Sequence, residues 1–78
     1  MKNVIVYSTA YCPYCRTLKQ FLKQNNIEFK EIDVAEDEKA AEEMIRKSGQ
    51  MGVPVVEIDG EIVVGFDKET IAKLLNIK

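Results

Sequence analysis

Residues 4–7 form an unbroken run of three β-branched residues and one tyrosine. A run of this kind, without polar alternation, is typical of a strand that is buried on both faces. From Pro13 the apolar residues recur at helical spacing, which predicts a helix that ends near residues 25–26. In residues 27–34 apolar and polar side chains alternate, though imperfectly, which predicts a second strand. Because a strand-helix-strand unit is right-handed, the first two strands should lie parallel in one sheet.

The second half of the sequence predicts a helix, a hairpin and a final helix. Residues 36–47 begin with acidic and end with basic side chains, as the dipole of a helix favours. The mostly apolar residues 55–58 and the apolar residues 62–64 flank Asp59-Gly60, a pair that favours the tight turn of a β-hairpin. Asp67 is placed to cap a last helix. The resulting order, β-α-β-α-β-β-α, predicts an α/β fold with a four-stranded mixed sheet and helices on both faces. It is consistent with a thioredoxin-like fold and also with other small α/β arrangements.

Length and charge exclude several classes of function. With 78 residues, 46% hydrophobic and 31% charged, the chain should form a single domain over residues 1–78. Eleven basic against thirteen acidic residues leave a net charge of −2, so we expect no nucleic-acid partner and no binding to anionic membranes. There is no apolar stretch of about 18 residues, and residues 4–7 are shorter than the roughly 7–15 residues of a signal sequence. We therefore expect a cytoplasmic protein.

The chain contains two cysteines, Cys12 and Cys15, and no histidine. The absence of histidine excludes Ser-His and Cys-His nucleophile pairs, and a zinc site within one chain would lack half of its ligands. A secreted disulfide scaffold of this size usually has more cysteines, spread along the chain. The two cysteines are therefore predicted to be functional rather than structural.

Cys12 lies where the first strand passes into the first helix. The N-terminus of a helix favours an anion, so this position favours a thiolate, the nucleophilic form of cysteine. Cys15 is one turn further along the same face and should be more shielded and remain protonated. This spacing predicts that Cys12 attacks a substrate disulfide and that Cys15 resolves the mixed disulfide. Alternatives are an iron-sulfur cluster shared between two chains, two small core residues, or an interaction module with incidental cysteines.

Three segments together resemble a glutaredoxin: residues 11–15 after the first strand, Val53-Pro54 before the third, and Gly65-Phe66-Asp67 before the last helix. The resemblance covers essentially the whole chain, and Cys12-Pro13-Tyr14-Cys15 is the characteristic dithiol glutaredoxin motif. It implies a thioredoxin-like fold, with Cys12 as nucleophile and Cys15 as resolving thiol. It also implies a cis peptide at Val53-Pro54 that faces the thiols, with the Val53 backbone pairing with an extended substrate or glutathione.

The segments that would bind glutathione depart from the pattern of the family. Many glutaredoxins have a lysine three residues before the first cysteine and a basic residue shortly before the cis-proline. Here those positions are Thr9 and Gln50, which implies weaker glutathione binding. Gly65-Phe66 also resembles the glutaredoxin-like electron donors of ribonucleotide reductase, which thioredoxin reductase reduces. Glutathione and thioredoxin reductase are therefore both candidate reductants.

The resemblance further implies a substrate- or glutathione-binding site formed by Tyr14, Val53, Pro54, Gly65, Phe66 and Asp67. Asp67 has a second interpretation as the N-cap of the last helix, and Tyr14 and Tyr11 have one as partly buried core residues. Arg16 and Lys19 either add positive potential near Cys12 or form a solvated helix face. We expect disulfide-containing proteins as partners, glutathione as a possible co-substrate, no bound cofactor or metal, and a monomer that acts in electron transport and redox homeostasis.

Overall fold

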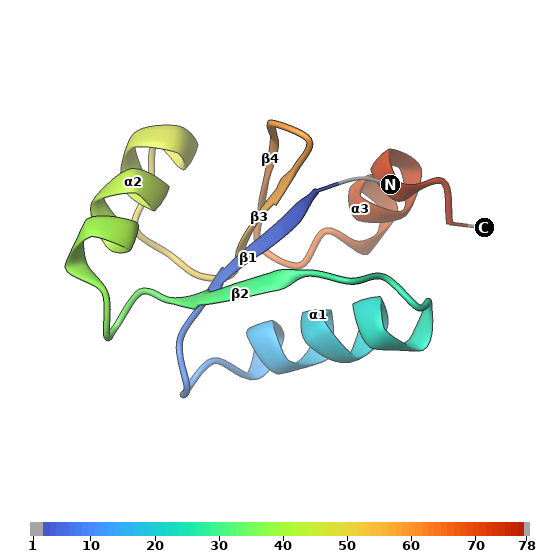
Figure 1. Ribbon diagram of the computed structural model, residues 1–78, viewed down its shortest axis with the longest axis horizontal. Helices are drawn as coiled ribbons and strands as arrows, with labels where there is room; N and C mark the ends of the chain where they lie inside the picture. The colour runs from blue at the N-terminus through green and yellow to red at the C-terminus, as the bar shows by residue number, and fades with distance from the viewer. Residues whose placement is uncertain (1–2, 78) are drawn as a thin grey trace.

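The chain forms four strands and three helices in the predicted order β-α-β-α-β-β-α (Figure 1). The structure is a computed structural model and describes residues 3–77. No helix within this described part is long and apolar enough to cross a membrane. The elements are β1 (Val4–Ser8), α1 (Pro13–Gln24), β2 (Lys30–Asp33), α2 (Glu38–Ser48), β3 (Val55–Ile58), β4 (Glu61–Val64) and α3 (Lys68–Leu75).

The strands form one mixed sheet in the order β2-β1-β3-β4. The pair β1 and β2 is parallel, whereas β3 is antiparallel to both β1 and β4, as the sequence predicted. In this register Tyr7, near the end of β1, lies opposite Val55 at the start of β3. The loop that leaves β1 and the loop that enters β3 therefore meet at the same end of the sheet.

The two faces of the sheet are covered by different helices. On one face α1 and α3 contribute Leu18, Leu22 and Ile71 to a core with Val6 and Val56, all of them inaccessible to solvent. On the other face α2 packs Ala40 and Met44 against Tyr7 and Val55. In Figure 1, α1 and α2 lie on opposite sides of the central strands. The central position of β1, buried from both sides, explains its unbroken apolar composition.

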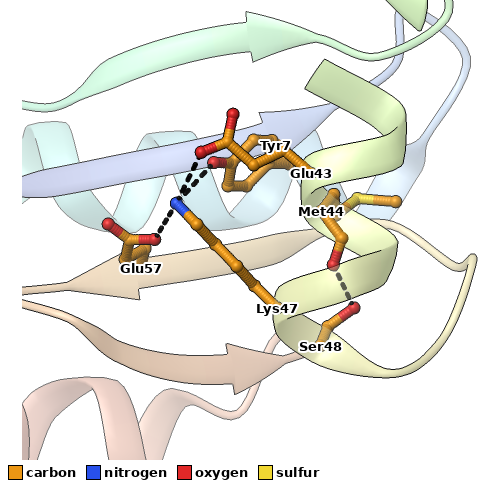
Figure 2. Close-up of polar contacts among 6 residues, drawn as sticks. All are labelled: Tyr7, Glu43, Met44, Lys47, Ser48 and Glu57. Atoms are coloured by element: carbon orange, nitrogen blue, oxygen red, sulfur yellow. Dashed lines mark hydrogen bonds and ion pairs between the residues drawn. The ribbon is translucent and has the colours of Figure 1, made fainter. Parts of the chain in front are cut away.

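A polar cluster fixes the end of α2 to the sheet (Figure 2). The Lys47 ammonium lies 2.7 Å from a carboxylate oxygen of Glu57 on β3, 3.0 Å from one of Glu43, and 3.4 Å from the Tyr7 hydroxyl. These partners raise the pKa of Lys47, the hydrogen bond with Glu57 having the largest effect. The Ser48 hydroxyl, on the residue after Lys47, donates to the Met44 carbonyl at 2.6 Å. The loop that leads into β3 therefore begins at a helix end that these contacts hold against the sheet.

Two predicted boundaries were wrong. The second strand begins at Lys30 rather than at Ile27, because the Ile27 N–H still donates to the Leu22 carbonyl at 2.9 Å and so terminates α1. The second helix begins at Glu38, since the Asp37 carboxylate accepts from the Ala40 N–H at 3.1 Å and acts as N-cap. The predicted hairpin is confirmed, with Asp59 and Gly60 at φ angles of 48° and 88°.

Candidate active site at the start of the first helix

Cys12 is the N-cap residue of α1, with the extended backbone that this position requires. Its sulfur accepts a hydrogen bond from the Cys15 N–H, with 3.2 Å between the nitrogen and Sγ. Pro13 follows as the first helical residue, where its missing N–H leaves no helical hydrogen bond unmade. The Cys12 side chain is partly exposed, so its sulfur is accessible from outside while a helix N–H points at it. This is the geometry expected of an attacking thiol.

Cys15 differs from Cys12 in burial, although one helical turn separates them. Its side chain is completely buried. Burial, followed by the hydrogen bond with Cys12, raises the pKa of the Cys15 thiol from 9.0 to about 12, against smaller opposing effects of the Thr9 backbone and Lys19. The prediction that Cys15 is more shielded than Cys12 is confirmed, and the raised pKa favours its protonated form.

The loop that enters β3 faces the thiols, as the resemblance implied. The peptide bond between Val53 and Pro54 is cis. The Val53 carbonyl accepts from the Cys12 thiol across 3.8 Å, and the Pro54 carbonyl accepts from the Gly65 N–H at 2.8 Å. The Val53-Pro54 loop thus contacts both Cys12 and the segment at Gly65, which are distant from it in the sequence.

The other expected binding residues have more varied environments. The Asp67 carboxylate accepts from the N–H and the hydroxyl of Thr70, at 3.2 and 2.8 Å, so its role as N-cap of α3 is confirmed. Phe66 is partly buried and packs against Phe21, with ring centroids 5.9 Å apart. Tyr14 is 68% exposed and Tyr11 is 93% exposed, so neither is part of the core.

The two positions that lack the expected cations have other contacts. The Gln50 side chain bonds the backbone of Gly52, accepting from its N–H at 2.7 Å and donating to its carbonyl at 2.9 Å. Thr9 is partly exposed beside Cys15. Of the two basic residues considered near Cys12, Arg16 is exposed and Lys19 pairs with Glu31 at 2.5 Å.

Sequence reasoning missed a polar network beneath α1. The hydroxyl of Ser8, which is almost fully buried at the end of β1, donates to the Glu31 carboxylate at 2.9 Å, and the same oxygen accepts from Lys19. These contacts, led by the hydrogen bond with Lys19, lower the pKa of Glu31. The available signal was strand alternation, because Ile32 packs against the α2 face and Glu31 must then point toward α1.

An accessible and a buried cysteine at the start of α1, facing a cis-proline loop on a four-stranded mixed sheet, define a thioredoxin-fold protein with a dithiol site. Comparison with known proteins agrees with this class. The glutaredoxin family model matches residues 4–63. A glutaredoxin-like 8.6 kDa protein from the rubredoxin operon of Clostridium pasteurianum is 51% identical over 70 residues, covering 90% of this chain and 93% of its own.

Two further relatives extend the comparison. Glutaredoxin 3 of Escherichia coli K12 is 36% identical over 67 residues, covering 86% of this chain and 81% of its own. A crystal structure of a variant of the thioredoxin-like protein BC3987 superposes with a TM-score of 0.93 at 41% identity, covering 100% of both chains. The chain belongs to the glutaredoxin family, and the predicted thioredoxin-like fold is confirmed. The family supports thiol-disulfide oxidoreductase chemistry, and the comparisons do not favour the cluster-binding alternative.

Proposed function

We propose that this protein is a dithiol-disulfide oxidoreductase that reduces protein or mixed disulfides. The Cys12 thiolate attacks one sulfur of the substrate disulfide, so that a Cys12-substrate disulfide forms and the other substrate sulfur leaves as a thiolate. Cys15 then loses its proton and attacks Cys12, which releases the second substrate thiolate and leaves a Cys12-Cys15 disulfide. Two electrons pass from the protein dithiol to the substrate, and an external reductant restores the dithiol.

The contrast between the two sulfurs carries this proposal. Cys12 is accessible and accepts from the Cys15 N–H at 3.2 Å, whereas the Cys15 thiol is buried with its pKa raised to about 12. Burial is the larger cause of this raised pKa, and a mixed disulfide on Cys12 would remove the smaller contribution of the Cys12 side chain. Formation of the Cys12-substrate disulfide therefore favours deprotonation of Cys15 for the second attack. In the reduced protein without substrate, the Cys15 thiol stays neutral.

The proposed substrate groove follows the backbone around Cys12. The Val53 backbone would pair with an extended substrate, and Tyr14, Pro54, Gly65, Phe66 and Asp67 would line the remainder of the groove. We propose no resident cofactor, with glutathione as a co-substrate, and a monomer that works in the cytoplasm. Glutathione and thioredoxin reductase remain the two proposed electron donors.

Trapping of the mixed disulfide tests the two cysteine roles. With a glutathionylated or disulfide-bonded peptide, Cys15→Ser should accumulate a covalent adduct on Cys12 that intact-mass spectrometry detects. The matched Cys12→Ser variant should form no adduct and should lose turnover. An adduct on Cys15 in Cys12→Ser, formed as fast as the adduct on Cys12, would overturn the assignment of roles.

The electron donor is tested with the oxidised wild-type protein and NADPH consumption. One reaction contains glutathione and glutathione reductase, and the other contains thioredoxin reductase. Fast turnover with glutathione would mean that backbone contacts suffice without a charge at Thr9 or Gln50. Turnover with thioredoxin reductase alone would identify a thioredoxin-like donor built on a glutaredoxin fold.

A further inference from the structure

Exposed apolar side chains gather at the thiol end of the molecule. Within residues 3–77, four large hydrophobic side chains are exposed: Tyr11 at 93%, Met51 at 78%, Tyr14 at 68% and Val64 at 50%. Tyr11, Tyr14 and Met51 each lie within two residues of either Cys12 or Val53 in the sequence. The thiol of Cys12 contacts the carbonyl of Val53. Exposed apolar groups that gather around a reactive atom, rather than scattering over the surface, indicate a surface that a partner covers.

The loop around Met51 is built to hold this side chain outward. Gln50, the residue before it, closes a ring onto Gly52, the residue after it, through hydrogen bonds of 2.7 and 2.9 Å. The Gln50 carbonyl accepts from the Ser48 hydroxyl at 3.0 Å, which ties the ring to the end of α2. A Cβ at Gly52 would lie 2.8 Å from Gln50 Oε1, so the ring requires glycine here. Met51 is thus exposed in a hydrogen-bonded loop, two residues before Val53, whose carbonyl contacts the Cys12 thiol.

The two loops that meet at Cys12 are uncharged. Residues 8–15 and residues 48–56 contain no Asp, Glu, Lys or Arg. Among the neighbouring charged residues, Lys19 pairs with Glu31, whereas Arg16, directly after Cys15, is exposed. A ligand with several charges finds no counter-ion in these loops, whereas an uncharged apolar segment loses no ionic solvation when it covers them.

We propose that Tyr11, Tyr14 and Met51 form an apolar rim around Cys12 that selects polypeptide disulfides with uncharged, apolar side chains next to the half-cystine. This inference rests on the proposed function, because the partner is the disulfide substrate itself. A methionine suits the role, since its flexible thioether packs against apolar side chains of different shapes. The exposed rings of Tyr11 and Tyr14, on either side of Cys12 in the sequence, add rigid apolar area.

The test uses blocked, uncharged hexapeptides with one cysteine, each in mixed disulfide with the chromophore nitrothiobenzoate. One peptide has leucine on both sides of the cysteine and the other has serine. Attack by Cys12 on the peptide sulfur releases the chromophoric thiolate, the better leaving group, and stopped-flow absorbance gives the rate constant. The rate constant for the leucine peptide is divided by that for the serine peptide. This ratio is then divided by the ratio measured with N-acetylcysteine as the attacking thiol, which corrects for the different intrinsic reactivity of the two peptide disulfides. A nitrothiobenzoate disulfide of glutathione provides the charged comparison.

We expect a normalised ratio of about ten for the wild type, from the apolar area that the rim covers. Met51→Ser should reduce it to about two to three, while Met51→Leu should retain it, and both should attack a small symmetric disulfide at the wild-type rate. The glutathione derivative should react more slowly than the leucine peptide. A ratio near one in the wild type, with normal chromophore release, would overturn the rim and leave the oxidoreductase function standing. No release from any disulfide would overturn the proposed function itself.

Discussion

The backbone N–H of Cys15 points at the sulfur of Cys12, with 3.2 Å between the two atoms. The main chain of the second cysteine therefore holds the side chain of the first, while the side chain of the second is completely buried. One helical turn thus contains one accessible and one inaccessible sulfur. This difference within the Cys12-Pro13-Tyr14-Cys15 motif has consequences that can be measured without knowledge of the substrate.

We expect iodoacetamide to modify Cys12 alone when the reduced, folded protein is treated near neutral pH. Alkylation requires a thiolate that the reagent can reach, and Cys15 is buried with its pKa raised to about 12. Intact-mass spectrometry should show one adduct per chain, and peptide mapping should place it on Cys12. In denaturant both cysteines should react. Comparable modification of Cys15 in the folded protein would contradict the observed burial.

Stability should fall in the alkaline range because of Cys15. Unfolding returns the pKa of this thiol from about 12 to 9.0, so between these values the unfolded state binds fewer protons than the folded state. The free energy of unfolding should then decrease as pH rises, by up to about 1.4 kcal/mol per pH unit, and should not depend on this group below pH 9. Urea unfolding curves at increasing pH measure the slope.

Cys15→Ala is the control for this slope. Lys47 also has a raised pKa and contributes with the same sign, but only above its ordinary value of 10.5. From pH 9 to 10.5 the difference between the wild type and Cys15→Ala therefore isolates Cys15. Equal slopes in the two proteins would show that the folded state does not hold the Cys15 proton.

Most of the fold follows from local patterns in the sequence. The buried run of β1 and the turn residues Asp59-Gly60 each specify a local geometry that the surrounding structure does not override. The predicted start of β2 was wrong because Ile27 and Phe29 are apolar residues that alternate with polar ones, as in a strand. In the structure they pack against the core from the segment that follows α1. A pattern of apolar residues reports burial, and burial alone does not distinguish a strand from a helix terminus.

Part of the candidate active site was also predictable from the sequence. Cys12 and Cys15 could be placed from their spacing and the strand-helix junction, and the Val53-Pro54 loop came from the family resemblance. The Gln50 ring and the outward position of Met51 could not be predicted, because they depend on side-chain hydrogen bonds within one loop. Nor does the sequence show that Ser8 and Lys19 share the same Glu31 oxygen, which requires the sheet register.

Gln50 and Gly52 should behave as one unit in a double-mutant cycle. Gly52→Ala places a Cβ 2.8 Å from Gln50 Oε1 and displaces the side chain, and Gln50→Ala removes it. Each single variant loses the same two hydrogen bonds and should lose about 1–2 kcal/mol of stability. The double variant should lose little more than either single one, so the coupling energy should be close to the loss of one single variant, about 1–2 kcal/mol. Strictly additive losses in urea unfolding would show that the ring does not link these residues.

Asp67 should stabilise α3 through its capping contacts with Thr70. Asp67→Ala removes both acceptors and should lower the Tm by roughly a few degrees, whereas Asp67→Asn keeps one acceptor for the Thr70 N–H and should lower it less. The hydrogen bonds with Thr70 hold the pKa of the Asp67 carboxyl below its ordinary 3.8, so this stabilisation is present above that pH and is lost as pH falls through the lowered value. Thermal melts should therefore show the difference between wild type and Asp67→Ala shrinking on acidification. A difference that stays constant below pH 3.8 would indicate that the carboxylate charge is not what caps the helix.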